Sequence, residues 1–185
     1  MGENTKKITL PISEAEVRKL KAGDTVSITG VVYTARDMAH KYMIEGLLAK
    51  GSLPMDVKGQ AIYYTGPTPA IPGQIIGSCG PGSGYRMDPY APFLIEQGLR
   101  IMIGKGPINK TVIEAMKKHG AVYLAAIGGT GAIIARIVKK AEVVAYENLG
   151  PDAILRLEVE NFTSIVAIDS NGNNLYAEAI SKFGQ

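Results

Sequence analysis

The stretch Thr25-Val-Ser-Ile-Thr-Gly-Val-Val-Tyr33, followed at once by Thr34-Ala-Arg-Asp-Met-Ala-His40, decides the fold. Residues Thr25–Tyr33 alternate in polarity and are rich in β-branched side chains, which predicts a strand. The pattern changes at Thr34, and residues Ala35–Lys50 have the composition of a helix that ends near Gly51. A strand that runs directly into a helix indicates an α/β fold.

The rest of the chain continues this alternation, with strand-rich ends. Further helices are predicted at Ser13–Leu20, Pro89–Gln97, Asn109–His119 and Ala132–Ile137. Further strands are predicted at Gln60–Thr65, Leu99–Ile103, Val122–Ile127, Val138–Tyr146, Leu155–Val159 and Ile165–Asp169, with a short extended piece at Gln74–Ile76. A tight turn over Asp169–Asn173 is expected to lead into a further extended pair, Leu175-Tyr176. We therefore expect one α/β domain over residues 1–185, a mixed sheet with flanking helices.

Composition narrows the class of protein. The chain has 185 residues, of which 46% are hydrophobic and 20% charged, as in ordinary globular domains. A net charge of +3 without runs of like charge gives no reason to expect nucleic-acid binding. No apolar run approaches the ~20 residues of a membrane span, and the start of the chain lacks the apolar core of a signal peptide. The expected location is the cytoplasm.

The segment Gly77-Ser-Cys-Gly-Pro-Gly-Ser-Gly-Tyr-Arg-Met-Asp88, here called the glycine loop, is the first candidate for a functional site. Its glycines and proline argue against a regular helix or a packed strand. Such a loop lets backbone approach a small ligand closely, and it carries the hydroxyl of Ser83 and the charge of Arg86. The segment fits an ordinary surface turn as well as an anion-binding loop.

Three other patterns are weaker. Gly98–Gly106 approaches a P-loop, but the spacing is one residue too long and Gly106 replaces the magnesium-binding hydroxyl. Gly128–Gly131 lacks the dinucleotide fingerprint, so close helix packing explains it better than anion binding, which stays open. Cys79 fits a small buried side chain better than a nucleophile, and one cysteine cannot hold an iron–sulfur cluster.

Three cations remain, each at a strand end or among glycines: Arg36, Arg86 and Lys105. Guanidinium groups bind carboxylates in a bidentate manner, and lysine adds a point charge. If these residues converge on one pocket, they suit a small dicarboxylate. The hydroxyls of Thr34 and Ser83 are candidates for further contacts.

Several motifs of the chain resemble, in order and spacing, the class I fumarase and tartrate dehydratase family. They are Thr34-Ala-Arg-Asp-Met-Ala-His40, Tyr63-Tyr-Thr-Gly-Pro-Thr-Pro69, Gly77-Ser-Cys-Gly-Pro81 with Arg86-Met-Asp88, Ile103-Gly-Lys-Gly106, Gly128-Gly-Thr-Gly-Ala132, Glu147-Asn-Leu-Gly150 and Val166-Ala-Ile-Asp169. The resemblance covers nearly the whole chain. It corresponds to the C-terminal domain of single-chain enzymes, which is the β subunit of two-subunit enzymes.

The resemblance implies a swivelling β/β/α-type domain and a hydro-lyase that adds water reversibly to a small dicarboxylate, as from fumarate to malate. It also implies a [4Fe-4S] cluster that is bound by three cysteines of a partner α subunit and not by this chain. The open iron of the cluster would act as a Lewis acid. The site would lie between subunits of a hetero-oligomer such as α2β2, with a homodimer for the isolated chain.

Carried over residue by residue, the resemblance makes Arg36, Arg86 and Lys105 the carboxylate-binding cations, with Thr34 as a further substrate contact. Arg86 and Lys105 would also stabilise the charge that develops during catalysis. Asp37 and His40 are implied to support the site by orienting Arg36, although helix capping explains Asp37 nearly as well.

The chain departs from the family at one important position. Family members usually have Gly-Pro-Thr-Thr-Ser before the arginine, and the first threonine is the proposed proton-transfer residue. Gly82 occupies that position here, and Ser83 replaces the second threonine. Either Ser83 transfers the proton, or water or the partner subunit does. The interpretations that follow are a fumarate hydratase β subunit, an L-tartrate dehydratase β subunit, a non-catalytic dicarboxylate-binding or regulatory module, and a structural subunit that covers the partner's cluster.

Overall fold

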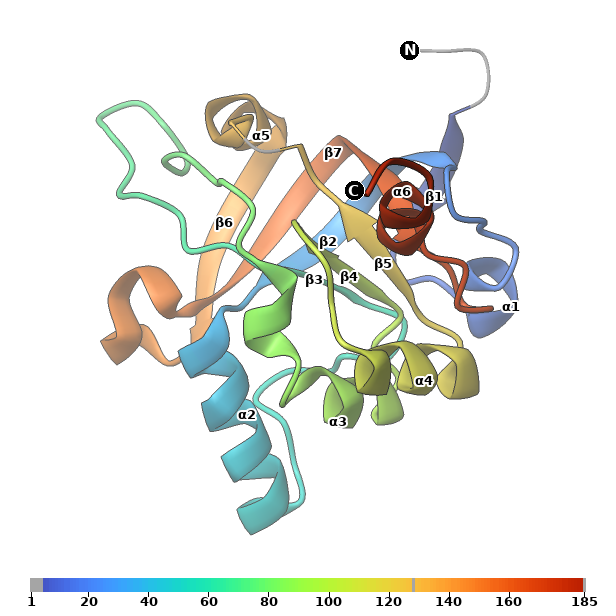
Figure 1. Ribbon diagram of the computed structural model, residues 1–185. Helices are drawn as coiled ribbons and strands as arrows, with labels where there is room; N and C mark the ends of the chain where they lie inside the picture. Colours follow the sequence, from blue (N-terminus) through green and yellow to red (C-terminus); the bar gives the residue numbers. More distant parts are fainter. Residues whose placement is uncertain (1–4, 128, 185) are drawn as a thin grey trace.

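The computed structural model describes residues 5–127 and 129–184, which form a mixed sheet flanked by helices (Figure 1). The strands are β1 (Lys6–Thr9), β2 (Thr25–Thr34), β3 (Ala61–Tyr63), β4 (Ile101–Gly104), β5 (Val122–Ala125), β6 (Val138–Ala145) and β7 (Ile154–Ile168). The helices are α1 (Glu14–Val17), α2 (Asp37–Lys50), α3 (Ala91–Glu96), α4 (Lys110–His119), α5 (Gly131–Ile137) and α6 (Leu175–Phe183), with 3₁₀ turns η1 (Gly84–Met87) and η2 (Glu147–Asp152).

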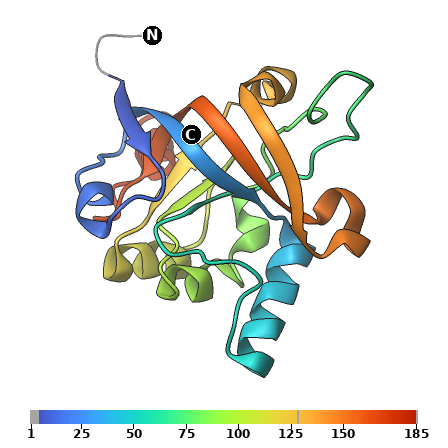
Figure 2. The ribbon, with the colours of Figure 1, turned by 180° about the vertical axis from the view of Figure 1, so that it is seen from behind.

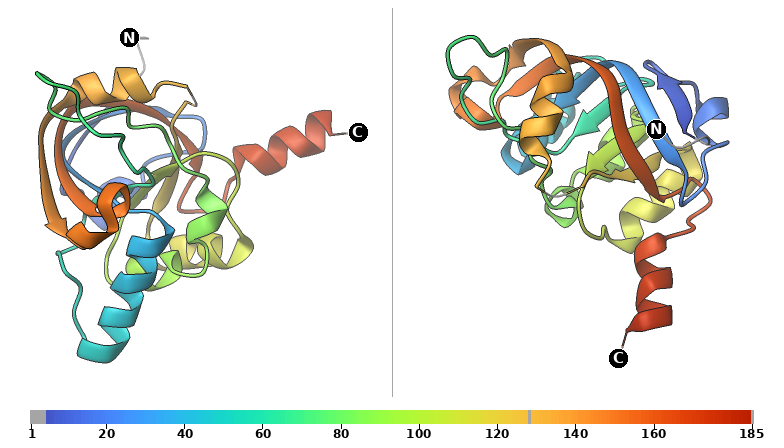
Figure 3. Two further views of the ribbon diagram at one scale, coloured as in Figure 1. Left: turned by 90° about the vertical axis from the view of Figure 1, so that its left-hand side faces the viewer. Right: turned by 90° about the horizontal axis from the view of Figure 1, so that it is seen from above.

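The sheet closes on itself. Strands β2, β3, β4 and β5 pair in parallel in that order, and β7 pairs antiparallel with both β5 and β2. These five strands therefore form a closed barrel, whose rounded outline is visible in Figure 3. β1 extends β2 in parallel, and β6 pairs with the first half of β7. Figure 2 shows β2, β7 and β6 from the side opposite to α2, α3 and α4.

Alternation along the strands separates two cores. Ile101, Ile103, Val122 and Leu124 point into the barrel, where Phe162 joins them. The residues between them point outward, and helices α2, α3 and α4 cover this outer face. Met102 of β4 and Tyr123 of β5 belong to that second core, as does Ile62 of β3. Strands buried on both faces explain the nearly continuous apolar runs of β3, β4 and β5.

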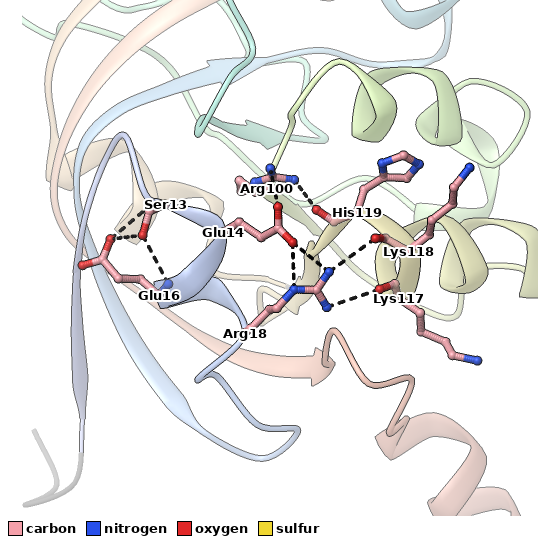
Figure 4. A network of polar contacts seen from close by, with 8 residues as sticks. All are labelled: Ser13, Glu14, Glu16, Arg18, Arg100, Lys117, Lys118 and His119. Carbon is pink, nitrogen blue, oxygen red and sulfur yellow. Dashed lines mark hydrogen bonds and ion pairs between the residues drawn. The ribbon is translucent and has the colours of Figure 1, made fainter.

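Side-chain caps begin α1 and α4, and a polar network ties α1 to the end of α4 (Figure 4). Ser13 and Glu16 form the capping box, and the side chain of Asn109 accepts a hydrogen bond from the Val112 N–H. Arg18 donates to the carbonyls of Lys117 and Lys118, and Arg100 to that of His119. The last carbonyls of α4 thus receive donors from two arginines.

Four predictions about secondary structure were wrong. Strand β1 was missed, the two predicted strands 155–159 and 165–169 are the single strand β7, and no strand forms at 74–76. β7 stays continuous because β2 pairs along its length, and Asn161 (φ 58°) occupies the bulge between them. Residues 175 and 176 begin helix α6 rather than an extended pair. This helix has no buried residue and extends away from the barrel (Figure 3).

Candidate active site

A cavity of about 210 Å³ lies where the chain leaves the carboxyl ends of β2 and β3. Crevices outside the carboxyl ends of parallel strands are the usual ligand sites of α/β sheets. The lining comes from the start of α2, from the residues after β3, and from the glycine loop. It consists of Arg36, Asp37, Thr65, Gly66, Gly80, Pro81, Gly82, Ser83, Arg86 and Met87. The cavity therefore brings together four of the predicted residues, Arg36, Asp37, Ser83 and Arg86.

Backbone hydrogen bonds fix the glycine loop against two strand ends. The Gly82 N–H donates to the Tyr64 carbonyl (2.5 Å), and the Lys105 N–H donates to the Gly82 carbonyl (3.0 Å). The Gly84 N–H donates to the Lys105 carbonyl (2.8 Å), so Ser83 and Lys105 form a short parallel bridge. Ser83 and Lys105, which are distant in sequence, are therefore backbone neighbours, although only Ser83 lines the cavity.

Glycine is required at two positions of this loop by close packing. A Cβ on Gly82 would lie 2.7 Å from the Tyr64 carbonyl oxygen, and one on Gly84 would lie 2.6 Å from the Tyr123 hydroxyl. The obstacle at Gly82 is backbone, which cannot move aside cheaply. The threonine that the family usually has at this position does not fit the present backbone. The loop also contains one turn of 3₁₀ helix, η1, which was not expected and which carries Arg86.

Each arginine of the cavity is paired with an aspartate. Arg36 Nη1 lies 3.0 Å from Asp152 Oδ1, and Arg86 Nη2 donates to Asp37 Oδ2 at 2.8 Å. The sequence analysis had assigned Asp37 to Arg36, and that pairing is wrong. Asp37 begins α2, and η1 packs against this helix, so the nearer guanidinium is that of Arg86.

His40 is fully buried one turn into α2, where its Nδ1 lies 2.8 Å from the Arg36 carbonyl oxygen. A carbonyl only accepts, so Nδ1 carries the proton. Burial lowers the pKa of His40 to about 4, which leaves the ring neutral at pH 7. The ring meets Tyr64 edge to face, with centroids 5.3 Å apart. His40 therefore contacts the backbone of Arg36 and not its guanidinium.

Thr34, Lys105 and Ser83 have different surroundings. Thr34 is fully buried at the end of β2, where its hydroxyl donates to the Ala153 carbonyl (3.3 Å) and accepts from the Leu155 N–H (3.0 Å). It does not line the cavity. Lys105 is exposed and does not line the cavity either, whereas Ser83 does. Within residues 5–127 and 129–184, the side chains of Ser83 and Lys105 form no hydrogen bond or ion pair, so both are available to a ligand.

Cys79 does not have the surroundings of a nucleophile or of a metal ligand. It is buried in the barrel core, its Sγ donates to the Gly77 carbonyl (3.3 Å), and burial raises the pKa of the thiol to about 11. In the described part of the chain, no three His, Cys, Asp or Glu side chains gather as metal ligands. Nor is any described helix long and apolar enough to cross a membrane. Of the motif 128–131, residue 128 lies outside the described residues.

Sequence reasoning missed Asp152, Thr65 and Gly66. Thr65 lies deep in the lining, and its hydroxyl donates to the Gly80 carbonyl (2.7 Å), which joins the two loops that border the cavity. A hydroxyl and a glycine directly after a buried strand are a usable signal for such a site. Asp152 stands in a turn far along the chain, where no local pattern marks its partner.

Comparisons with known proteins identify the family of the chain. The family described as Fumarase C-terminus matches residues 1–179, and the chain belongs to this family. The chain is 36% identical over 170 residues to the protein named fumarate hydratase class I, anaerobic, of Escherichia coli, with 91% of this chain and 31% of that protein covered. It is 38% identical over 165 residues to fumarate hydratase 1, mitochondrial, of Leishmania major, with coverages of 88% and 30%.

A third relative differs in extent. A protein of Methanocaldococcus jannaschii, provisionally named the L(+)-tartrate dehydratase subunit beta, is 38% identical over 177 residues, which cover 92% of this chain and 91% of that protein. The chain thus spans about a third of the fumarate hydratases that it matches, and nearly all of the smaller relative.

Proposed function

We propose that this chain is the β subunit of a [4Fe-4S]-dependent hydro-lyase that interconverts fumarate and malate. Residues 1–185 would form one domain of the swivelling β/β/α type, working in the cytoplasm. Its partner would be a cysteine-bearing α subunit, in an α2β2 assembly, and the isolated chain would form a homodimer. Membership of the Fumarase C-terminus family supports the class of reaction.

One observation carries the proposal beyond the family. Arg36 and Arg86 come from different loops and line one cavity of a size that suits a small organic acid. Each guanidinium uses one terminal nitrogen for its aspartate, Nη1 of Arg36 and Nη2 of Arg86, which leaves other donors free. Two such groups suit the two carboxylates of one substrate.

The chemistry explains why cations are needed. Hydration adds a hydroxyl group to one alkene carbon of fumarate and a proton to the other, which gives malate. In the reverse direction that proton leaves a carbon next to a carboxylate, and the electron pair spreads onto the carboxylate oxygens. Preorganised cations stabilise the charge that develops there. We assign this role to Arg86 and Lys105, and carboxylate binding to Arg36.

Ser83 is our candidate for moving the proton. Its hydroxyl makes no hydrogen bond in the described part of the chain, and the bridge to Lys105 brings the backbone of the two residues together. A free hydroxyl is a weak base and requires a neighbour to activate it. Water or a group of the α subunit would serve if Ser83 does not. Thr34, in contrast, would not contact the substrate; its hydroxyl would hold the backbone of Ala153 and Leu155 in place.

The cluster itself does not fit this chain. Cys79 is buried and hydrogen-bonded, so its thiol does not suit iron ligation. We therefore place the [4Fe-4S] cluster on the partner and assign to this chain only the binding of carboxylates, the stabilisation of charge and the transfer of a proton.

The test is to co-express this chain with a cysteine-bearing α subunit, reconstitute the cluster under anaerobic conditions, and assay fumarate. Arg86→Ala should reduce kcat/KM by at least ~10². Arg156→Ala is the matched control, because Arg156 is an ion-paired arginine of β7 whose side chain is 31% exposed and which does not line the cavity. Turnover near the wild-type level in Arg86→Ala would remove Arg86 from the site.

A second candidate is the β subunit of an L-tartrate dehydratase. The chain covers 91% of the relative with that name. Assaying both acids on the same enzyme decides between the two substrates. Tight binding of fumarate by this chain alone, with no turnover by the assembled complex, would instead indicate a non-catalytic dicarboxylate-binding module. Wild-type activity after joint removal of Arg36 and Lys105 would indicate a structural subunit.

A further inference from the structure

The segment η2, between β6 and β7, lies beside the first turn of α2 and contributes the carboxylate that meets Arg36 (Figure 1). Asp152 is the last residue of η2, and its Oδ1 lies 3.0 Å from Arg36 Nη1. Both side chains are partly shielded, with 34% of Arg36 and 21% of Asp152 exposed. The pair is therefore neither a flexible surface contact nor a buried ion pair.

Contacts at both ends hold η2 in this place. At its start, the ring of Tyr146 packs edge to face on Tyr42 of α2, with centroids 5.5 Å apart. At its end, the hydroxyl of Thr34 bonds the Ala153 carbonyl and the Leu155 N–H. Thr34 stands two residues before Arg36, so one buried hydroxyl fastens the segment that bears the aspartate to the strand that bears the arginine.

The path of the Arg36 side chain is also fixed from the other side. A Cβ on Gly66 would lie 2.9 Å from Arg36 Cδ and 2.9 Å from the Pro151 carbonyl oxygen. The missing side chain of Gly66 thus leaves the channel through which Arg36 runs between the loop after β3 and η2. These contacts place the guanidinium at the cavity, where its Nη1 forms an ion pair with Asp152, although Asp152 Oδ1 accepts no aligned hydrogen bond in the described residues.

We propose that Asp152 is a positioning residue, which holds Arg36 in the orientation in which it binds a carboxylate of the substrate. Asp152 does not line the cavity, so it acts through Arg36. The inference rests on the proposed function, because it concerns the dicarboxylate that the assembled enzyme would bind. It adds a determinant of substrate affinity to the segment Glu147–Asp152, which is remote in sequence from the other site residues.

The sign of the effect separates positioning from charge alone. A carboxylate next to a cationic site repels a dianionic substrate, so removing its charge without moving Arg36 would lower KM. If Asp152 positions Arg36, Asp152→Asn should instead raise KM for fumarate roughly tenfold, with a smaller change in kcat. Asp152→Glu, which retains the carboxylate, should recover most of the affinity.

The control variant and a double-mutant cycle of Arg36 and Asp152 are both measured on the reconstituted complex. Asp24→Asn is the matched control, because Asp24 pairs with Lys6 at 2.6 Å, is 22% exposed, and lies outside the cavity. In Arg36→Lys enzyme, Asp152→Asn should change KM much less than in wild-type enzyme, because its target has been altered. Equal effects of Asp152→Asn in both backgrounds, a lowered KM, or a KM change no larger than that of Asp24→Asn would each overturn the inference.

A second measurement does not depend on catalytic turnover. In the full chain without partner, the guanidinium NMR signals of Arg36, assigned through Arg36→Lys, should shift or broaden in Asp152→Asn and persist in Asp152→Glu. Unchanged signals in Asp152→Asn would refute positioning. If the complex converts neither fumarate nor tartrate, the proposed function fails, and these signals alone then decide whether Asp152 holds Arg36.

Discussion

Two irregular segments follow β3 in direct succession, and they differ in almost every physical respect. Residues 68–75, which we call the proline loop, are all exposed and include Ile71 (62%) and Ile75 (53%). The glycine loop after them buries Cys79, Pro81, Gly84 and Met87 and is bonded to two strand ends. Both segments lack regular structure for most of their length, so the absence of a helix or strand does not indicate a lack of order. Hydrogen bonds to strand ends indicate order, and in the described residues the glycine loop has them while the proline loop does not. The proline loop is held to the glycine loop at its start, where the Thr68 N–H donates to the Ser78 carbonyl (3.0 Å).

The largest predicted effect is a loss of folding stability in acid. It comes from His40, whose neutral ring packs against Tyr64, the residue to which the glycine loop is hydrogen-bonded. Burial lowers the pKa of His40 to about 4, so the unfolded chain binds more protons between that value and 6.5. The stabilisation is complete above pH 6.5 and is lost as the pH falls, by about 3 kcal/mol at pH 4. Urea unfolding at pH 7 and 4.5 should show this loss in wild type and not in His40→Gln.

Asp88 changes the pH dependence of folding stability in the opposite direction and therefore needs its own control variant. Burial raises the pKa of its carboxyl to about 6, so its contribution is present in acid and is lost as the pH rises. The loss of stability in acid should therefore be steeper in Asp88→Asn. The same acid sensitivity in His40→Gln as in wild type would contradict the role of His40.

The next effect tests the close approach within the glycine loop itself. Gly82→Ala should lower the free energy of unfolding by about 2 kcal/mol, because its Cβ meets the Tyr64 carbonyl oxygen. Gly80→Ala is the matched control in the same loop, since a Cβ there meets nothing within 4 Å, and its effect should stay within about 0.5 kcal/mol. Equal free energies of unfolding for the two variants would show that the loop is as adaptable as the proline loop.

A smaller effect is expected for the ion pair that joins the loop to α2. Asp37→Asn breaks the contact with Arg86, whose side chain is 45% exposed, so unfolding should become easier by no more than about 1 kcal/mol. Thermal unfolding at low and high salt measures this contribution, which salt should reduce. A cost that is larger and insensitive to salt would mean that Asp37 supports the fold in another way.

The smallest effect is expected in the proline loop. Ile71→Ser removes an exposed side chain and should change the free energy of unfolding by no more than about 0.5 kcal/mol. Chemical denaturation against wild type is sufficient to measure it. A loss of 2 kcal/mol would show that the proline loop packs in solution, and the contrast between the two loops would then fail.

The sequence predicted what local patterns encode. The strand from Thr25 alternates in polarity, and the helix that ends at Lys50 has a helical composition and a glycine stop, and the structure has both. Arg36, Arg86 and Ser83 were recognised because cations and hydroxyls stood among glycines at strand ends, and all three line the cavity. Their roles toward a substrate stay predictions.

What sequence missed depends on partners that are distant along the chain. The closure of β2 on β7 leaves no local trace, and polar residues near Asn161 gave the impression of a break between two strands. Helix α6 was missed although Tyr176, Ile180 and Phe183 recur at helical spacing, because the tight turn before it favoured a hairpin. Asp152 was missed because its partner is distant along the chain: a carboxylate in a turn looks alike in sequence whether it meets water or a guanidinium, and Asp37 was assigned to Arg36 instead of Arg86.

The closure of the barrel also has a consequence for synthesis of the chain. β2 can complete its pairing only with β7, whose last residue is Ile168, so the ring cannot close on the ribosome until almost all of these residues have emerged. Contacts between residues so far apart in sequence form late and slow folding. Until then the edges of β2 and β5 that pair with β7 in the folded chain are open, and unpaired strand edges can pair with other chains.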